Sequence, residues 1–141
     1  MICLSESVNE QLNVNLVGFL NVLRYATPKL RNNNFGRVIY ISSVLAKKPM
    51  RGAGIYSASK SFCESLIKTY SLENSKYNIT ANSIQLGYFN EGLINKLSDE
   101  ILQGVLDKIT LKRLGKVSEL CNVIETVINT EYLNGTTIPN T

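Results

Sequence analysis

The sequence predicts an α/β protein with a parallel sheet, because strand-like and helix-like segments alternate along the chain. Residues 37–41 and 79–85 are short and rich in apolar and β-branched side chains, as strands buried in a parallel sheet usually are. Residues 7–29 and 56–73 carry apolar side chains at spacings of three and four, which is typical of helices with one buried face. Together they give the order helix, strand, helix, strand.

The other elements follow from breakers and turn residues. Pro28 and then the asparagines at 32–34 are expected to end the first helix. Residues 47–54 contain a proline and two glycines and are expected to form the loop before the second helix. After the second strand we expect a loop, two more helices and a short last strand, at residues 86–92, 98–108, 118–130 and 136–138. We treat residues 1–141 as a single domain.

Composition excludes several classes of protein. The content of 44% hydrophobic and 18% charged residues is ordinary for a globular domain, and a net charge of +4 from scattered basic residues predicts no nucleic-acid partner. No apolar run is long enough to span a membrane, and no leader pattern is visible at the first residues, so we expect no membrane partner. Three distant cysteines, Cys3, Cys63 and Cys121, are expected to be reduced thiols of a cytoplasmic protein.

The chain contains no histidine. A Ser-His-Asp or Cys-His catalytic arrangement therefore cannot form, and neither can a zinc site with histidine ligands. Because the three cysteines are dispersed, the sequence also offers no motif for a thiolate metal site. We expect no metal.

Three polar side chains stand out around the first strand and the helix after it: Ser43, Tyr56 and Lys60. Tyr56 and Lys60 are four residues apart, so in a helix they lie on one face, one turn from each other. An ammonium close to a phenol favours the phenolate, which helps the phenol exchange a proton with a substrate oxygen. Ser43, at the end of the strand, can hydrogen-bond the same oxygen. The arrangement predicts acid–base chemistry on an alcohol or a carbonyl.

The spacing alone is weak evidence, because Tyr25 and Lys29 repeat it elsewhere in the chain. That copy contains Pro28 and follows no strand that ends in serines. The copy at Tyr56 follows an apolar strand with a serine pair at its end and opens a strongly helical segment. Only this second copy has the context that the chemistry requires.

With this context the sequence resembles the C-terminal part of the short-chain dehydrogenase/reductase family, and within it members like the 3-oxoacyl-ACP reductases. Family members carry a serine thirteen residues before a Tyr-x-x-x-Lys motif and an asparagine twenty-eight residues before that serine. The matching residues are Asn15, Ser43, Tyr56 and Lys60. By its position alone Asn15 is better explained as a solvent-facing residue of a helix, and it is the register with Ser43 that favours the family role. Three more segments resemble family motifs in the same order, at residues 82–88, 111–119 and 134–138.

The resemblance implies a partial Rossmann-like fold, a doubly wound parallel sheet that lacks the N-terminal dinucleotide-binding βαβ units. It implies NAD(P) as the cofactor, with NADP(H) favoured, and Tyr56 as the general acid/base. Ser43 would hold the substrate oxygen, Lys60 would assist the phenol and bind the nicotinamide ribose, and Asn15 would position a water of a proton relay. The residues expected to contact the cofactor are Asn15, Tyr56, Lys60, Gly87 and Phe89.

The glycine-rich turn that holds the cofactor pyrophosphate in this family is missing from the sequence. A truncated product, an incomplete gene model and one half of a two-chain protein would each explain this. Residues 37–41 would then form an unpaired sheet edge, so we expect the chain alone to be poorly stable and to hold a nicotinamide cofactor weakly. An inactive remnant that acts only as an association module is the alternative to an oxidoreductase.

The resemblance also bears on partners. The substrate is expected to be a small carbonyl or alcohol, and a 3-oxoacyl thioester, a sugar and a steroid all fit. In the family the two long helices form a dimer interface, so the chain is expected to form a homo-oligomer through residues 7–29 and 56–73.

Overall fold

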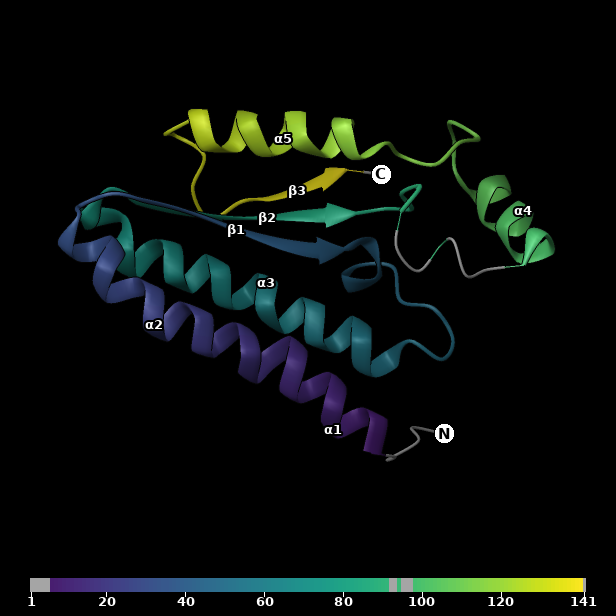
Figure 1. Ribbon diagram of the computed structural model, residues 1–141, viewed down its shortest axis with the longest axis horizontal. Helices are drawn as coiled ribbons and strands as arrows, with labels where there is room; N and C mark the ends of the chain where they lie inside the picture. The colour runs from purple at the N-terminus through teal and green to yellow at the C-terminus, as the bar shows by residue number, and fades with distance from the viewer. Residues whose placement is uncertain (1–5, 92–93, 95–97, 141) are drawn as a thin grey trace.

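The computed structural model describes residues 6–91, 94 and 98–140, and in this part of the chain a three-stranded parallel sheet carries helices on both faces (Figure 1). Strand β1 (Gly36–Ser43) pairs with β2 (Ile79–Leu86), and β2 pairs with β3 (Thr137–Asn140). The predicted α/β class and the parallel sheet are confirmed. Strand β1 forms one edge of the described sheet, as expected. Cys3, one of the three cysteines expected to be reduced, lies outside the described residues.

The first long helix consists of three segments in succession: α1 (Glu6–Leu12), the π-helical η1 (Asn13–Gly18) and α2 (Phe19–Asn32). The helix ends at Asn32, within the asparagines expected to end it, but the predicted bound at residue 29 is wrong, because the helix continues through Pro28 for three residues beyond that point. A proline removes only its own N–H from the hydrogen-bond ladder. The next turn closes normally, with the Asn33 N–H donating to the carbonyl of Lys29 at 3.1 Å.

The second long helix, α3 (Gly54–Asn74), begins two residues before the predicted position and ends one residue after it. A 3₁₀ turn, η2 (Val44–Ala46), connects β1 to the loop before α3. After α3 a second 3₁₀ turn, η3 (Ser75–Tyr77), leads to Asn78, whose φ of 54° is left-handed. Asparagine tolerates this conformation better than most residues, so the chain turns into β2 without a glycine.

The C-terminal elements also lie close to their predicted ranges. Helix α4 (Asp99–Lys108) and helix α5 (Val117–Asn129) match the predicted helices to within one residue at each end. The last strand, β3, begins one residue later than predicted and ends two residues later. Figure 1 shows α5 on the face of the sheet opposite to α2 and α3. No helix in the described part of the chain is both long and apolar enough to cross a membrane.

The main core lies between the sheet and the pair of helices α2 and α3. Side chains of β1 and β2 that share this face pack against the inner faces of the two helices. Ile67, Ile79 and Ala81 are fully buried there. The buried members of this cluster are Leu23, Tyr40, Cys63, Ile67, Tyr70, Ile79 and Ala81. The cluster fixes α3 against the sheet, and α3 carries the predicted Tyr56 and Lys60.

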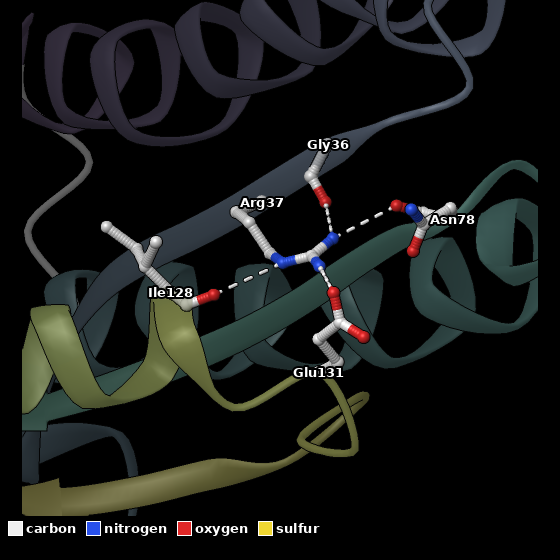
Figure 2. A network of polar contacts seen from close by, with 5 residues as sticks. All are labelled: Gly36, Arg37, Asn78, Ile128 and Glu131. Atoms are coloured by element: carbon white, nitrogen blue, oxygen red, sulfur yellow. Dashed lines mark hydrogen bonds and ion pairs between the residues drawn. The ribbon is translucent and has the colours of Figure 1, made fainter.

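A single arginine, Arg37 of β1, connects the sheet to the end of α5 at the amino ends of the strands (Figure 2). The Arg37 guanidinium donates to the carbonyls of Gly36 at 2.9 Å, Asn78 at 3.0 Å and Ile128 at 3.3 Å. It also forms an ion pair of 3.2 Å with Glu131, just after α5. The side chain of Arg37 is only 6% exposed, so it is packed between these elements. The predicted site residues lie at the opposite, carboxyl end of the strands.

Candidate active site

The structure brings Tyr56 and Lys60 together in the first turns of α3. The Lys60 Nζ atom lies 5.6 Å from the centroid of the Tyr56 ring and 5.0 Å from that of the Tyr40 ring. The same atom donates a hydrogen bond of 2.9 Å to the carbonyl of Ile41 in β1. An ammonium group is therefore held between two phenols, at the carboxyl end of a parallel strand. Ligands of open α/β sheets bind at this end.

Burial tunes the groups around this ammonium. Burial lowers the pKa of Lys60, and the negative charges that Cys63 and Glu64 can carry oppose this effect. Burial raises the pKa of the Cys63 thiol, and it raises the pKa of Tyr40 far above the ordinary value for a phenol. Cys63 and Tyr40 are therefore neutral near neutral pH. Of the two groups that can oppose the effect of burial on Lys60, Glu64 is the carboxylate, and both of its oxygens accept hydrogen bonds.

Ser43 is the last residue of β1 and is 9% exposed. Its Oγ atom accepts a hydrogen bond of 3.2 Å from the backbone N–H of Leu45 and caps the turn η2. It lies two residues after Ile41, whose carbonyl holds Lys60. Ser43 is thus at the same end of the sheet as the Tyr56–Lys60 pair. The hydrogen bonds of the described residues include none between Ser43 and Tyr56.

Asn15 lies in the π-helical segment η1, and π-helical turns are often found at functional sites. Its Nδ2 atom donates to the Ser59 hydroxyl at 3.1 Å, and this hydroxyl donates to the carbonyl of Tyr56 at 2.7 Å. The carbonyl of Asn15 accepts a hydrogen bond of 3.3 Å from the Cys63 thiol. Asn15 is therefore fastened to the turn that carries Tyr56 and Lys60, through two neighbouring side chains.

Gly87 and Phe89 follow β2 and line a cavity of about 620 Å³. The backbone N–H of Gly87 donates to the carbonyl of Asn140 at 3.0 Å, and Phe89 forms a parallel bridge with Gly115. A Cβ on Gly115 would lie 2.9 Å from the Phe89 ring, so a larger residue there would force the ring to move. The cavity does not include the three predicted site residues, because Ser43, Tyr56 and Lys60 are absent from its lining. Its basic lining residues are Lys47, Lys48, Lys108 and Arg113.

One buried acid of the site escaped the sequence analysis. Glu64 is 7% exposed, and its carboxylate accepts hydrogen bonds from the Ser42 hydroxyl at 2.5 Å and from Gln85 Nε2 at 2.9 and 3.1 Å. A signal was available in the helical pattern. Glu64 follows Lys60 by one turn and precedes Ile67 by three residues, which places an acid on the buried face of α3.

The described residues contain no group of three or more His, Cys, Asp or Glu side chains that could hold a metal ion. What the arrangement offers is a phenol beside an ammonium, and a serine hydroxyl at the adjacent strand end. These groups can exchange a proton with a bound oxygen and hydrogen-bond it.

Comparison with known protein families gives one match that spans almost the whole chain. The family model described as enoyl-(acyl carrier protein) reductase matches residues 3–139. The 3-oxoacyl-(acyl-carrier-protein) reductase MabA of Mycobacterium bovis is 32% identical over 136 residues, which cover 95% of this chain and 55% of the relative. The acetoacetyl-CoA reductase of Shinella zoogloeoides is 28% identical over 133 residues, covering 92% and 55%. The chain thus spans about half the length of these curated relatives.

Solved structures show the same fold. A 3-oxoacyl-(acyl-carrier protein) reductase from Brucella melitensis superposes with a TM-score of 0.92 at 22% identity, covering 99% of this chain and 53% of the other. An NAD⁺-bound xylitol dehydrogenase superposes with a TM-score of 0.85 at 21% identity, covering 94% and 58%. The described sheet and helices therefore form part of a Rossmann-like architecture.

Proposed function

The chain belongs to the short-chain dehydrogenase/reductase family, and on that basis we propose that it serves hydride transfer between a nicotinamide cofactor and a carbonyl or alcohol. The observation that carries the proposal is the Lys60 ammonium, 5.6 Å from the Tyr56 ring and fixed to the end of β1. This geometry holds a positive charge beside the phenol. Tyr56 can then give a proton to the oxygen of a carbonyl, or take one from an alcohol.

Ser43 holds the reacting oxygen in this proposal. Because its Oγ atom already accepts a hydrogen bond from Leu45, its own hydroxyl proton remains available for donation to a substrate oxygen. Asn15 positions the water of a proton relay, and its attachment to Ser59 keeps it close to the turn of Tyr56 and Lys60.

The nicotinamide supplies the hydride when it is bound. Lys60 uses one N–H on the carbonyl of Ile41, so two N–H donors remain for a ribose hydroxyl. Gly87 and Phe89 would hold the nicotinamide end, because both line the cavity that opens at the carboxyl ends of the strands. We expect NADP(H) to be preferred to NAD(H).

We propose a 3-oxoacyl thioester as the substrate class. The named activities of two relatives, a 3-oxoacyl-(acyl-carrier-protein) reductase and an acetoacetyl-CoA reductase, support this choice. The cavity fits a substrate that carries phosphate groups, since its described lining includes Lys47, Lys48 and Lys108, while the lining acid Glu119 is paired with a further basic residue, Arg113. Sugars and steroids carry no phosphate groups that these basic side chains could bind.

The experiment is a reduction assay. The chain is mixed with acetoacetyl-CoA and either NADPH or NADH, and the loss of the reduced cofactor is followed by absorbance. Substrate-dependent oxidation of the cofactor, faster with NADPH, is the expected result. A parallel titration follows NADPH fluorescence. Absence of turnover in a chain that does bind NADPH would count against the assigned chemistry.

A second function, association through the two long helices, is favoured by their exposed apolar side chains. Val22 is 64% exposed and Tyr25 76% on α2, and Leu72 is 79% exposed on α3. We propose that a second copy of the chain covers these helices. Analytical ultracentrifugation should then find a dimer or larger oligomer, and Val22→Glu should shift it toward the monomer. A monomer at micromolar concentration would contradict this interface.

A cytoplasmic location remains a prediction.

A further inference from the structure

The polar cluster of Ser42, Glu64 and Gln85 lies directly beside the catalytic pair and takes no part in the chemistry assigned above. Ser42 and Gln85 are Cα partners in the β1–β2 pairing, so their side chains leave the sheet on the same face. Both donate to the carboxylate of Glu64, which comes from α3. Three elements thus meet at one buried acid.

All three side chains are almost completely shielded from solvent. The residues are 3% exposed at Ser42, 7% at Glu64 and 2% at Gln85. A carboxylate removed from water is costly unless hydrogen bonds and an opposite charge compensate it. Here the hydrogen bonds come from two neutral donors. The Lys60 ammonium comes from a residue one turn earlier on the same helix. Burial lowers the pKa of Lys60, and the charge of Glu64 opposes that effect.

Lys60 and Glu64 also hold neighbouring points of the same strand. Lys60 bonds the carbonyl of Ile41, and Glu64 bonds the hydroxyl of the next residue, Ser42. Two residues that are four apart on α3 therefore fix the position of this helix along the last residues of β1. The packing leaves Lys60 little freedom to move away from Tyr56.

We propose that Glu64 is a positioning residue for Lys60: its buried carboxylate, held by Ser42 and Gln85, keeps the ammonium charged and aimed at Tyr56. This role rests on the proposed function, because the charge of Lys60 matters through its effect on the phenol. Besides Tyr56, the other titratable groups near Lys60 are Tyr40 from β1 and Cys63 from α3, and burial raises the pKa of these two. Neither supplies a negative charge near neutral pH.

The test measures the protonation of Lys60 directly and needs no catalysis. The chain is labelled with ¹³C at its lysines, and the Cε resonance of Lys60, assigned with Lys60→Arg, is followed as the pH rises. Glu64→Gln keeps the size of the side chain and removes its charge. We expect the titration midpoint of Lys60 to fall by about one pH unit, because a nearby opposite charge favours the charged form.

The matched control is Glu73→Gln, which removes the same charge from an exposed position of the same helix and should leave the midpoint unchanged. The conservative Glu64→Asp should return it most of the way to that of the parent. A folded Glu64→Gln chain with an unchanged midpoint overturns the proposal, since a purely structural Glu64 would give that result.

A second variant covers the case in which Glu64→Gln does not fold. Ser42→Ala, Glu64→Met and Gln85→Met together replace the whole cluster by apolar side chains, an exchange that proteins often tolerate. The midpoint of Lys60 should fall in this chain as well, and an unchanged midpoint overturns the proposal. In the reduction assay the same variants should shift the pH profile of turnover. A chain without turnover would sink the enzymatic assignment, while the lysine titration would still decide the role of Glu64.

Discussion

Lys60 donates a hydrogen bond of 2.9 Å to the carbonyl of Ile41, and this bond joins α3 to the strand that ends in Ser43. Its consequence is that the ammonium is oriented before any cofactor arrives. A lysine side chain otherwise samples many rotamers, and ordering it costs free energy of up to about 2 kcal/mol. Here the side chain is already ordered by folding, so binding of a cofactor requires no large rearrangement of α3.

Replacing Tyr56 with phenylalanine should abolish turnover while sparing the fold. The change removes only the hydroxyl that passes the proton, and general acid–base groups contribute roughly a hundredfold to ten-thousandfold to rates. The reduction assay described above measures the loss, and NADPH fluorescence should show unchanged binding of the cofactor.

The chain supplies its own control for this prediction. Tyr25 and Lys29 have the same spacing, and Tyr25 is 76% exposed on α2. Tyr25→Phe should leave turnover within twofold of the parent. Comparable losses from the two substitutions would mean that neither phenol has a specific chemical role.

The pattern of the sequence was enough to place most elements, because their signals are local. Apolar spacing of three and four identified α3, and β-branched runs identified β1 and β2. The proximity of Tyr56 and Lys60 followed from the four-residue spacing in a helix. The position of Ser43 at the end of β1 needed only the boundary of one strand.

The contacts that the sequence did not reveal all depend on pairings between distant segments. The shared carboxylate of Glu64 requires Ser42 and Gln85 to be opposite each other, and this register is fixed only when β1 and β2 pair. The continuation of the first helix through Pro28 depends on how the turn after it closes. Arg37 reads as a solvent-facing residue at the start of a strand, yet it is buried by α5 and the turn before β2.

Arg37→Met should destabilise the chain by about 2–4 kcal/mol. The variant keeps the apolar stem and removes the donor shared by the backbone carbonyls of Gly36, Asn78 and Ile128, and a hydrogen bond of this kind contributes about 0.5–1.5 kcal/mol. Urea denaturation followed by circular dichroism gives the free energy of unfolding.

Glu131→Gln is the matched comparison, because it removes only the ion pair. The Glu131 side chain is 78% exposed, and such pairs contribute about 0–1 kcal/mol. If Glu131→Gln costs as much as Arg37→Met, the carbonyl contacts are not what stabilises this end of the sheet.

Gly135→Ala should lower the free energy of unfolding by about 1–2 kcal/mol, from backbone strain alone. Gly135 has a φ of 70°, and a Cβ there would lie 2.7 Å from the Ser71 Oγ atom. Its N–H donates to the carbonyl of Ala81 at 2.8 Å, so the backbone cannot easily move away. Gly104→Ala, in open space within α4, should instead stabilise the chain by about 0.5–1 kcal/mol. Thermal melts of the two variants should therefore shift in opposite directions, and parallel shifts would contradict the assigned strain.

The start of α5 should weaken in acid as Glu119 becomes protonated. Hydrogen bonds from Arg113, at 2.6 and 2.9 Å, and from the Lys116 N–H lower the pKa of Glu119 to about 2. Since the folded value lies below the unfolded one, this contribution is complete above the unfolded pKa of about 4.3 and is lost as the pH falls toward about 2. A ¹³C titration of the Glu119 carboxyl should show a midpoint near 2, and Arg113→Met should move it toward the unfolded value. Glu125→Gln removes an exposed charge from the same helix and should leave the midpoint unchanged. If instead Glu125→Gln shifts the midpoint and Arg113→Met does not, the overall charge of the helix, and not this ion pair, sets the acidity of Glu119.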